Sequence, residues 1–272
     1  MRNVNFRTVL IYLLTILVTA IFVFPLLWLF LTSFKTRVEI LAIPPKFIFK
    51  PSLGYYSFVL HSPFMTGFKN SIIIAVASSV FSVILGTLTA YGLSRYPIRL
   101  SENLLFWMLS LRMLPVIAII VPMYMIFRAL GLLDTHIALI LIYSIFNISF
   151  TVWLMKGMFD EVPRDLEESG MLDGYSPFEV FSKVSLPLVS AGIATTAVFC
   201  LIQTLNEFML ALILTNRVAV TAPVALSGFH AFFGIDWGNI TAAATIFLSP
   251  VIIFTIFVRK YLIRGLSFGG MK

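Results

Sequence analysis

The stretch EESGMLDGYSPFEVFSKVSLP, residues 167–187, differs sharply from the sequence around it. It contains two prolines and two glycines, and the wider segment 159–187 holds seven of the twelve acidic residues of the chain. The chain as a whole has 272 residues, of which 60% are hydrophobic and only 11% are charged. Because a soluble domain carries roughly 25% charged residues, the composition predicts an integral membrane protein.

Six apolar segments are long enough to cross a bilayer, which takes about 20 residues. They cover residues 8–34, 68–93, 104–128, 137–158, 188–214 and 239–260. The first segment is far longer than the core of a signal peptide, so we expect it to be retained as a helix. The predicted fold class is therefore all-α, a multi-pass membrane protein with six transmembrane helices. We expect an N-terminal helix with an outer loop at 1–67, a core with the other five helices at 68–260, and a tail at 261–272.

The orientation follows from the basic residues, which concentrate on the cytoplasmic side of membrane proteins. With the N-terminus inside, eleven Lys and Arg residues fall in inner segments and six in outer ones, four of these in the long loop that starts at Lys35. This distribution favours a cytoplasmic location for both termini and for the segment 159–187. The net charge of +7 is expected to serve contacts with the lipid bilayer rather than nucleic-acid binding.

The acidic segment carries the start and stop signals of two short helices. Pro163 suits the first turn of a helix that ends at about 172–173, and Gly174 suits a left-handed residue that terminates it. Residues 176–179, Ser-Pro-Phe-Glu, have the form of a capping box that starts a second helix toward Pro187. The alternative is a passive solvated loop, in which so many helix signals are unusual. We therefore predict a docking surface at 159–187.

This spacing resembles the EAA loop of ABC-importer permease subunits. The consensus of that loop is E-A-A, three residues, G, nine residues and I-x-L-P. Here Glu168 stands six residues before Gly174, and Val184-x-Leu186-Pro187 follows after nine more. The alanine pair is replaced by Ser169-Gly170, and the isoleucine by Val184. The ATPase-coupling residues that the resemblance implies are Glu167, Glu168, Ser169, Gly170, Asp173, Gly174 and Pro187.

The resemblance extends over nearly the whole chain. The strings RMLP at 112–115, GLLDT at 131–135, NEF at 206–208 and RGLSFGG at 264–270 occur in the order typical of the carbohydrate-uptake branch, and within it of the G-type permeases of maltose systems. The resemblance implies a type I importer fold in the cytoplasmic (inner) membrane of a bacterium or archaeon. It also implies a complex with a second permease subunit, two ATPase subunits and a soluble substrate-binding protein, with the tail reaching toward the ATPase dimer.

The chain has no phosphate-binding loop of its own, since it lacks G-x-x-x-x-G-K-[ST] and even a Gly-Lys dipeptide. We therefore expect that partner subunits bind ATP and Mg, and that this chain has no cofactor and no catalytic residues. The three histidines show no metal-ligand spacing, so no metal site is expected. The predicted function is import of a sugar or related polyol. The alternative is a secondary-active transporter driven by an ion gradient, although such proteins usually show repeated halves, which this sequence lacks.

Two ionisable residues, Arg112 and Glu207, lie deep inside predicted spans, where each costs on the order of 3 kcal/mol. They are expected either to lock helices, with each other as candidate partners, or to line the substrate path with Gln203 and Asn206. Because consecutive helical residues point about 100° apart, Asn206 is predicted to contact the sugar and Glu207 to lock or gate helices. Three polar residues of the fourth span are expected to hold helices together instead: Asn147, Ser149 and Thr151.

Overall fold

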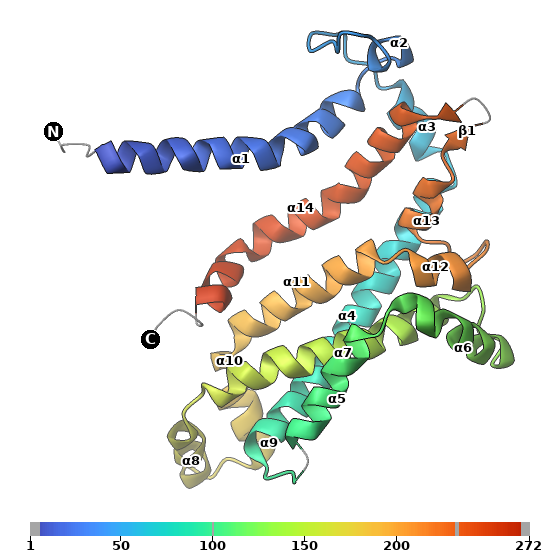
Figure 1. Cartoon of the computed structure of the whole chain (residues 1–272). Coiled ribbons are helices and arrows are strands. Elements are labelled where there is room, and N and C mark those ends of the chain that lie inside the picture. Colours follow the sequence, from blue (N-terminus) through green and yellow to red (C-terminus); the bar gives the residue numbers. More distant parts are fainter. Residues whose placement is uncertain (1–5, 100, 232–233, 268–272) are drawn as a thin grey trace. The chain divides into compact units, whose positions relative to one another are not determined.

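The computed structural model describes residues 6–99, 101–231 and 234–267, and Figure 1 traces the chain. The chain divides into two compact units. The first comprises Met1–Met65 with Leu226–Ser249, and the second comprises Thr66–Ala225 with Pro250–Lys272. The predicted division at residues 67 and 260 stays a prediction.

The first unit contains the N-terminal helix, the short elements that follow it and the segment around the start of α14. Its elements are α1 (Phe6–Thr32), α2 (Arg37–Ile40), α3 (Gly54–Leu60), the strands β1 (His230–Ala231) and β2 (Gly234–Ile235), and the start of α14 (Trp237–Ser267). The two strands form one antiparallel pair. Apart from these two-residue strands, the described residues form helices, turns and loops, which confirms the predicted fold class.

The second unit contains the remaining helices. They are α4 (Phe64–Arg95), α5 (Ser101–Met113), α6 (Val116–Ala129), α7 (His136–Asp160), α8 (Arg164–Leu172), α9 (Pro177–Val180), the π-helical turn η1 (Phe181–Ser185), α10 (Leu186–Leu188), α11 (Ser190–Asn206), α12 (Met209–Leu214) and α13 (Ala222–Ser227). Among the described residues, four single helices are long and apolar enough to span a membrane, and six spans result if each of two bent pairs counts as one.

The third predicted span is not one continuous helix. The prediction of a span at 104–128 is corrected to α5 and α6, which meet at an angle of 95° around Leu114 and Pro115. Proline has no amide hydrogen and disfavours the helical backbone at the residue before it, so the helix ends here.

The fifth predicted span, 188–214, is also interrupted. The chain bends by 75° before α11, and α11 ends at Asn206. Glu207 has an extended backbone, with φ −73° and ψ 127°, and α12 begins two residues later. The carboxylate of Glu207 accepts hydrogen bonds from the backbone N–H groups of Leu210 and Ala211 at 2.9 and 3.2 Å. These bonds satisfy amides that have no partner in the first turn of α12.

The core of the second unit surrounds α7, which packs against both α5 and α11 (Figure 1). Two apolar clusters lie at its two ends. Leu139 and Ile142 belong to one, together with residues of α4, α6 and α12. Met155 and Phe159 belong to the other, together with Phe181 of η1. The second cluster places the acidic loop directly on the buried end of α7.

Between the two clusters, small polar side chains join α4, α7 and α11. Asn147 donates to the hydroxyl of Thr204 at 2.9 Å, and Thr151 lies 3.6 Å from the sulfur of Cys200. A methyl group at Gly86 of α4 would come within 2.6 Å of Thr151, so only glycine permits this approach. The predicted role of Asn147 and Thr151 in holding helices together is thus confirmed, whereas Ser149 bonds Ile145 of its own helix.

Candidate coupling site and translocation cavity

The first helix of the acidic segment begins one residue later than predicted. Pro163 precedes α8 with an extended backbone, φ −58° and ψ 131°, and Arg164 is the first helical residue. The prediction that Pro163 lies in the first turn is therefore wrong by one position. The fixed φ of proline suits both places, and the extended ψ lets the chain turn sharply out of α7.

The end of α8 follows the prediction closely. The helix stops at Leu172, and Gly174 has a φ of +92°, in the left-handed region. The N–H of Gly174 bonds the carbonyl of Met171 at 3.0 Å, and the N–H of Tyr175 bonds the carbonyl of Gly170 at 3.1 Å. This pair of bonds is the Schellman arrangement, which satisfies the last free carbonyls of a helix.

The second helix of the segment starts with the predicted capping box. The hydroxyl of Ser176 accepts from the Glu179 amide at 3.4 Å, and the Glu179 carboxylate accepts from the Ser176 amide at 3.0 Å. The ammonium of Lys183 lies 2.9 Å from the same carboxylate. The hydrogen bond from Lys183, together with those from Ser176, lowers the pKa of Glu179 to about 2. The cap therefore stays ionised at neutral pH.

A π-helical turn, which the sequence analysis did not anticipate, follows α9. The amide of Leu186 bonds the carbonyl of Phe181 across this widened turn. Pro187 comes next and has no amide for a regular helical bond, so a widened turn accommodates it. The turn also places Ser185 in the protein interior.

A buried ion pair fixes α8 to the end of α4. The Nε atom of Arg95 donates to Oε2 of Glu167 at 2.7 Å, and the two side chains are only 8% and 6% exposed. The other guanidinium nitrogen atoms donate to the carbonyl oxygens of Phe159 and Val162 and to the hydroxyl of Ser94. Each of the three guanidinium nitrogen atoms thus has a partner, in α4, in α8 or at the end of α7.

The second carboxylate oxygen of Glu167 extends this junction to η1. It accepts from the hydroxyl of Ser185 at 2.5 Å. A neighbouring set of bonds adds α7, because Ser94 donates to Asp160 at 2.5 Å and Lys156 donates to the same carboxylate at 2.7 Å. We call the side chains of Arg95, Glu167 and Ser185 the buried junction. It ties four segments together, and neither Arg95 nor Ser185 was singled out from the sequence.

The predicted coupling residues divide into a buried and an exposed set. Glu167 and Gly170 face the interior, and a methyl group at Gly170 would lie 3.4–3.5 Å from Val184, Tyr175 and Val180. The exposed set comprises Glu168, Ser169, Asp173, Gly174 and Pro187. Two large apolar side chains, Leu172 and Phe178, are 89% and 70% exposed in the same segment. A polar loop that displays such side chains has the character of a docking surface.

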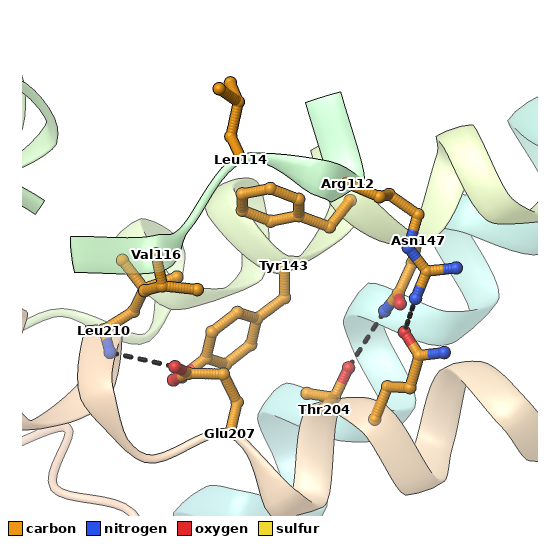
Figure 2. Close-up of a pocket in the computed structure, with 10 residues that line it drawn as sticks. Arg112, Leu114, Val116, Tyr143, Asn147, Thr204, Glu207 and Leu210 are labelled. Atoms are coloured by element: carbon orange, nitrogen blue, oxygen red, sulfur yellow. Dashed lines mark hydrogen bonds between the residues drawn. The ribbon is translucent and has the colours of Figure 1, made fainter. Parts of the chain in front are cut away.

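A cavity of about 180 Å³ lies where α5, α6, α7 and α11 converge (Figure 2). Figure 2 shows Arg112 and Asn147 toward one end of it and Glu207 with Leu210 toward the other. Three of the four predicted substrate-path residues line it, namely Arg112, Gln203 and Glu207. Tyr143 and Thr204 also line it, and Tyr143 could not be identified from the sequence because it is one of many apolar and aromatic residues on its helix.

The two charged residues of the cavity have different partners. The guanidinium of Arg112 donates to the side-chain oxygen of Gln203 and lies over the ring of Phe150, 4.7 Å from its centroid. The carboxylate of Glu207 accepts from the hydroxyl of Tyr143 at 2.7 Å. The candidate pairing of Arg112 with Glu207 is therefore not formed within the described residues.

Asn206 lies outside the residues that line this cavity. It is exposed at the last position of α11, and its amide donates back to the carbonyl of Ile202 at 2.9 Å. An angle of 100° between the Asn206 and Glu207 side chains requires a continuous helix, whereas α11 ends at Asn206 and Glu207 has an extended backbone. Contact between Asn206 and a sugar stays a prediction.

A second hydrogen-bond network surrounds Asp134, just before the N-terminal end of α7. Asp134 has a φ of +57°, and its carboxylate accepts from the backbone amides of Asn216, Arg217, Val218 and Ala219 at 3.0–3.2 Å. Burial opposes the charge, but the four amides together lower the pKa of Asp134 below its ordinary value. Asn70 of α4 donates to the carbonyls of Val218 and Val220 in the same segment.

The described residues contain no group of three or more His, Cys, Asp or Glu side chains that could hold a metal ion. Cys200 is a free and buried thiol.

Comparison with known proteins places this geometry in a family. Residues 82–268 match the family described as "Binding-protein-dependent transport system inner membrane component". The chain is 39% identical to the probable ABC transporter permease protein y4oR of Sinorhizobium fredii, over 93% of this chain and 91% of the relative. It is 31% identical to the trehalose/maltose transport system permease protein MalG of Thermococcus litoralis, over 100% of this chain and 99% of the relative.

The fold agrees with that of a solved structure. A chain of a bacterial ABC transporter involved in the import of the acidic polysaccharide alginate superposes with a TM-score of 0.78, over 96% of this chain and 98% of that one, at 22% identity. This likeness confirms the predicted importer permease fold, and the relatives give no support to the ion-gradient alternative. The chain belongs to the family of inner-membrane permease components of binding-protein-dependent ABC transport systems.

Proposed function

We propose that this chain forms one half of the translocation path of an ATP-driven importer, and that the substrate is a sugar or a related polyol. The substrate class is supported by MalG of Thermococcus litoralis, a trehalose/maltose permease that this chain matches over its full length. The cavity chemistry agrees with it, because amide, hydroxyl and charged groups converge on one apolar-walled space.

The observation that carries the coupling role is the exposed face of α8 and α9. Leu172 and Phe178 stand out from a loop whose other side is fixed by the buried junction. This face docks in a groove of an ATPase subunit, with Glu168 and Asp173 at its rim. The partners are two ATPase subunits, a second permease subunit and a soluble binding protein outside the membrane.

Motion passes from the ATPase pair into the membrane through the buried junction. Closure of the ATPases displaces α8, and Glu167 transmits the displacement to α4 through Arg95 and to η1 through Ser185. Because η1 continues through α10 into α11, the displacement of η1 also moves α11, which carries Gln203 at the cavity wall. The cavity then opens alternately to the two sides.

This chain performs no bond chemistry. ATP and Mg are bound and used by the ATPase subunits, and both termini lie in the cytoplasm. The acidic segment 159–187 faces the cytoplasm in this orientation, as docking to an ATPase requires. The proposed path residues are Arg112, Gln203 and Glu207, which line the cavity, together with Asn206.

The test is uptake by the purified complex in liposomes. The complex is assembled with the second permease subunit, the ATPase subunits and the binding protein encoded beside this chain, and a panel of labelled sugars and polyols is presented with the binding protein. Uptake that requires both ATP inside and the binding protein outside is expected. Uptake that follows a proton or sodium gradient without ATP would overturn the proposal. The variant Glu168→Lys tests the docking face in the same complex. It is expected to lose substrate-stimulated ATP hydrolysis while the complex still assembles.

A further inference from the structure

A cavity of about 420 Å³ lies in the first unit, apart from the coupling site and the translocation cavity. The end of α1, the start of α14 and the short helix α2 enclose it. Most of its walls are apolar, but Lys35 and Thr32 lie among the lining side chains. Its remaining lining residues are Pro25, Trp28, Leu29, Ile40, Leu41, Trp237 and Thr241.

Lys35 is a buried cation without a counter-ion in the described part of the chain. Only 2% of the residue is exposed. Its ammonium lies 4.2 Å from the centroid of the Trp28 ring and 5.3 Å from that of Phe49, and no ion pair or hydrogen bond of this ammonium is formed with the described residues. Rings attract a cation through their negative faces, but they recover only part of the cost of removing it from water.

To the same cavity, Thr32 contributes a buried hydroxyl without a partner in the described part of the chain. The residue is 6% exposed, and its hydroxyl has no hydrogen-bond partner among the described residues. Buried hydroxyl groups are normally satisfied. A missing acceptor that serves both Thr32 and Lys35 would resolve both deficits at once.

The local structure holds these groups in place rather than leaving them on a free end. The hydroxyl of Ser33 lies 2.7 Å from that of Tyr56, and the carbonyl of Phe34 accepts from the amide of Ser52 at 2.8 Å. Glu39, the one acidic residue of the loop 35–67, is half-buried and feels the positive charge of Lys35, but it forms no ion pair with it and accepts instead from the amide and hydroxyl of Thr36. Asp236, the other acidic residue described in this unit, bonds Asn239, so no carboxylate of the described residues forms an ion pair with Lys35.

We propose that the cavity binds the phosphate-bearing headgroup of an anionic phospholipid, with the phosphate between Lys35 and Thr32. The cavity lies where the apolar span of α1 ends, which is the depth of the headgroups. Two tryptophans line it, and tryptophan favours this interface. None of the most apolar stretch of α1 is buried within the chain, so an acyl chain can continue along this helix.

The charge of the loop supports an anionic partner. Residues 35–67 carry Lys35, Arg37, Lys46 and Lys50 against the single acidic residue Glu39. Basic residues are uncommon on the outer side of a membrane protein, where this loop is placed by the distribution of charges. An outer-leaflet lipid site gives these residues a role, because juxtamembrane basic residues attract anionic headgroups.

The test measures lipid retained by the full transporter complex in a mild detergent. The complex is incubated with phosphatidylglycerol or phosphatidylcholine of identical acyl chains, and the bound lipid is counted by native mass spectrometry. The unaltered complex is expected to retain phosphatidylglycerol preferentially. Lys35→Gln should lower that retention about five-fold, the factor that one basic residue near an anionic surface contributes. Lys35→Arg should preserve it, and so should Lys46→Gln, a matched loss of charge at an exposed position of the same loop.

Several results would overturn the proposal. Equal retention by Lys35→Gln and the unaltered complex would do so, as would equal retention of the two lipids. Displacement of the lipid by millimolar inorganic phosphate would show a site for small anions. If Lys35→Gln instead lost the second permease subunit at unchanged lipid retention, a carboxylate of that subunit would be the missing partner. If the Lys35→Gln complex fails to assemble, the retention of phosphatidylglycerol against phosphatidylcholine by the unaltered complex still tests whether the site prefers an anionic headgroup.

Discussion

Arg95 and Glu167 form a buried ion pair, 2.7 Å long, between the end of the second membrane helix and the helix of the acidic loop. Both charges have further hydrogen bonds, because Arg95 also donates to two carbonyl oxygens and Glu167 also accepts from Ser185. Removing one partner of such a pair leaves an uncompensated buried charge, which is more costly than the pair itself is favourable. The pair is therefore better suited to fix the orientation of α8 than to raise overall stability.

Glu167→Ala is expected to destabilise the acidic loop by roughly 3–5 kcal/mol, the usual cost of an orphaned buried charge. Substrate-stimulated ATP hydrolysis should fall with it, because α8 loses its attachment to α4. Thermal unfolding and ATPase assays on the reconstituted complex measure the two effects. For the unfolding measurement alone, Glu168→Ala is the matched control, since Glu168 is the exposed neighbour and should change stability by less than about 0.5 kcal/mol. Equal destabilisation by the two variants would contradict this assignment.

The two glycines of the loop should respond to alanine in opposite ways. Gly174 has a φ of +92°, so Gly174→Ala introduces backbone strain of about 1–2 kcal/mol although the space is open. Gly170 lies inside α8 with room for a methyl group, so Gly170→Ala should stabilise the helix by up to about 1 kcal/mol. Thermal unfolding of the purified complex distinguishes the two. A stabilising Gly174→Ala would show that the left-handed turn is not retained in the complex.

The acidic loop was largely predictable because its signals are local. Ser176, Gly174 and Glu179 act on amides and carbonyls within a few residues, and each is found in its expected role. The breaks at Pro115 and Glu207 were missed, because apolar composition alone does not report where a membrane helix is interrupted. Arg95 could not be identified either, since its partner is 72 residues away in the sequence.

The cavity was predicted only in part for the same reason. Arg112 and Glu207 were found as ionisable residues in apolar runs, a signal that needs no tertiary information. Their partners depend on which helix faces lie together, and Tyr143 carries no such signal. The candidate pairing of Arg112 with Glu207 is not formed, because Arg112 bonds Gln203 and Glu207 bonds Tyr143 in the folded chain.

Asp134 is expected to control the order of the segment that follows α12. Asp134→Ala removes an ionised acceptor from four backbone amides, and bonds to charged groups contribute about 1.5–3 kcal/mol. Amide hydrogen exchange at 216–219 should therefore accelerate by about tenfold or more. Asp165→Asn, an exposed acid on α8, is the control and should leave this exchange unchanged.

The same carboxylate gives a defined pH dependence. Its folded pKa lies below the unfolded value, which is about 3.9. The stabilisation is therefore fully present above the unfolded pKa and is lost as the pH falls through the folded pKa. Protection of 216–219, corrected for intrinsic exchange, should stay constant from neutral pH down to about 5 and decrease below about 4. A decrease already between pH 7 and 5 would point to another group.

Glu207 should affect uptake through the break between α11 and α12. Glu207→Gln keeps one acceptor oxygen, which can serve either the Leu210 amide or the Ala211 amide and the Tyr143 hydroxyl, whereas Glu207→Ala leaves all three without their acceptor. We expect transport in proteoliposomes to be impaired more by the alanine variant. Asn206→Ala is tested beside them, and it should lower uptake while basal ATP hydrolysis is nearly intact. Normal uptake by Asn206→Ala would remove Asn206 from the path and leave the cavity residues as the substrate contacts.

Arg112 bonds Gln203 and not the candidate partner Glu207. Double-mutant cycles can distinguish these two pairings in the assembled transporter. Because Arg112 donates to Gln203, the variants Arg112→Gln and Gln203→Ala should be non-additive, with a coupling energy of about 0.5–3 kcal/mol in unfolding free energy. Arg112→Gln and Glu207→Gln share no hydrogen-bond partner among the described residues, so their effects should add to within about 0.5 kcal/mol. Strong coupling between Arg112 and Glu207 with none to Gln203 would show that the assembled transporter rearranges the cavity into a direct ion pair. Coupling to Gln203 alone would leave the guanidinium without a neutralising carboxylate, and therefore available to hydrogen-bond the hydroxyl groups of a substrate that enters the cavity.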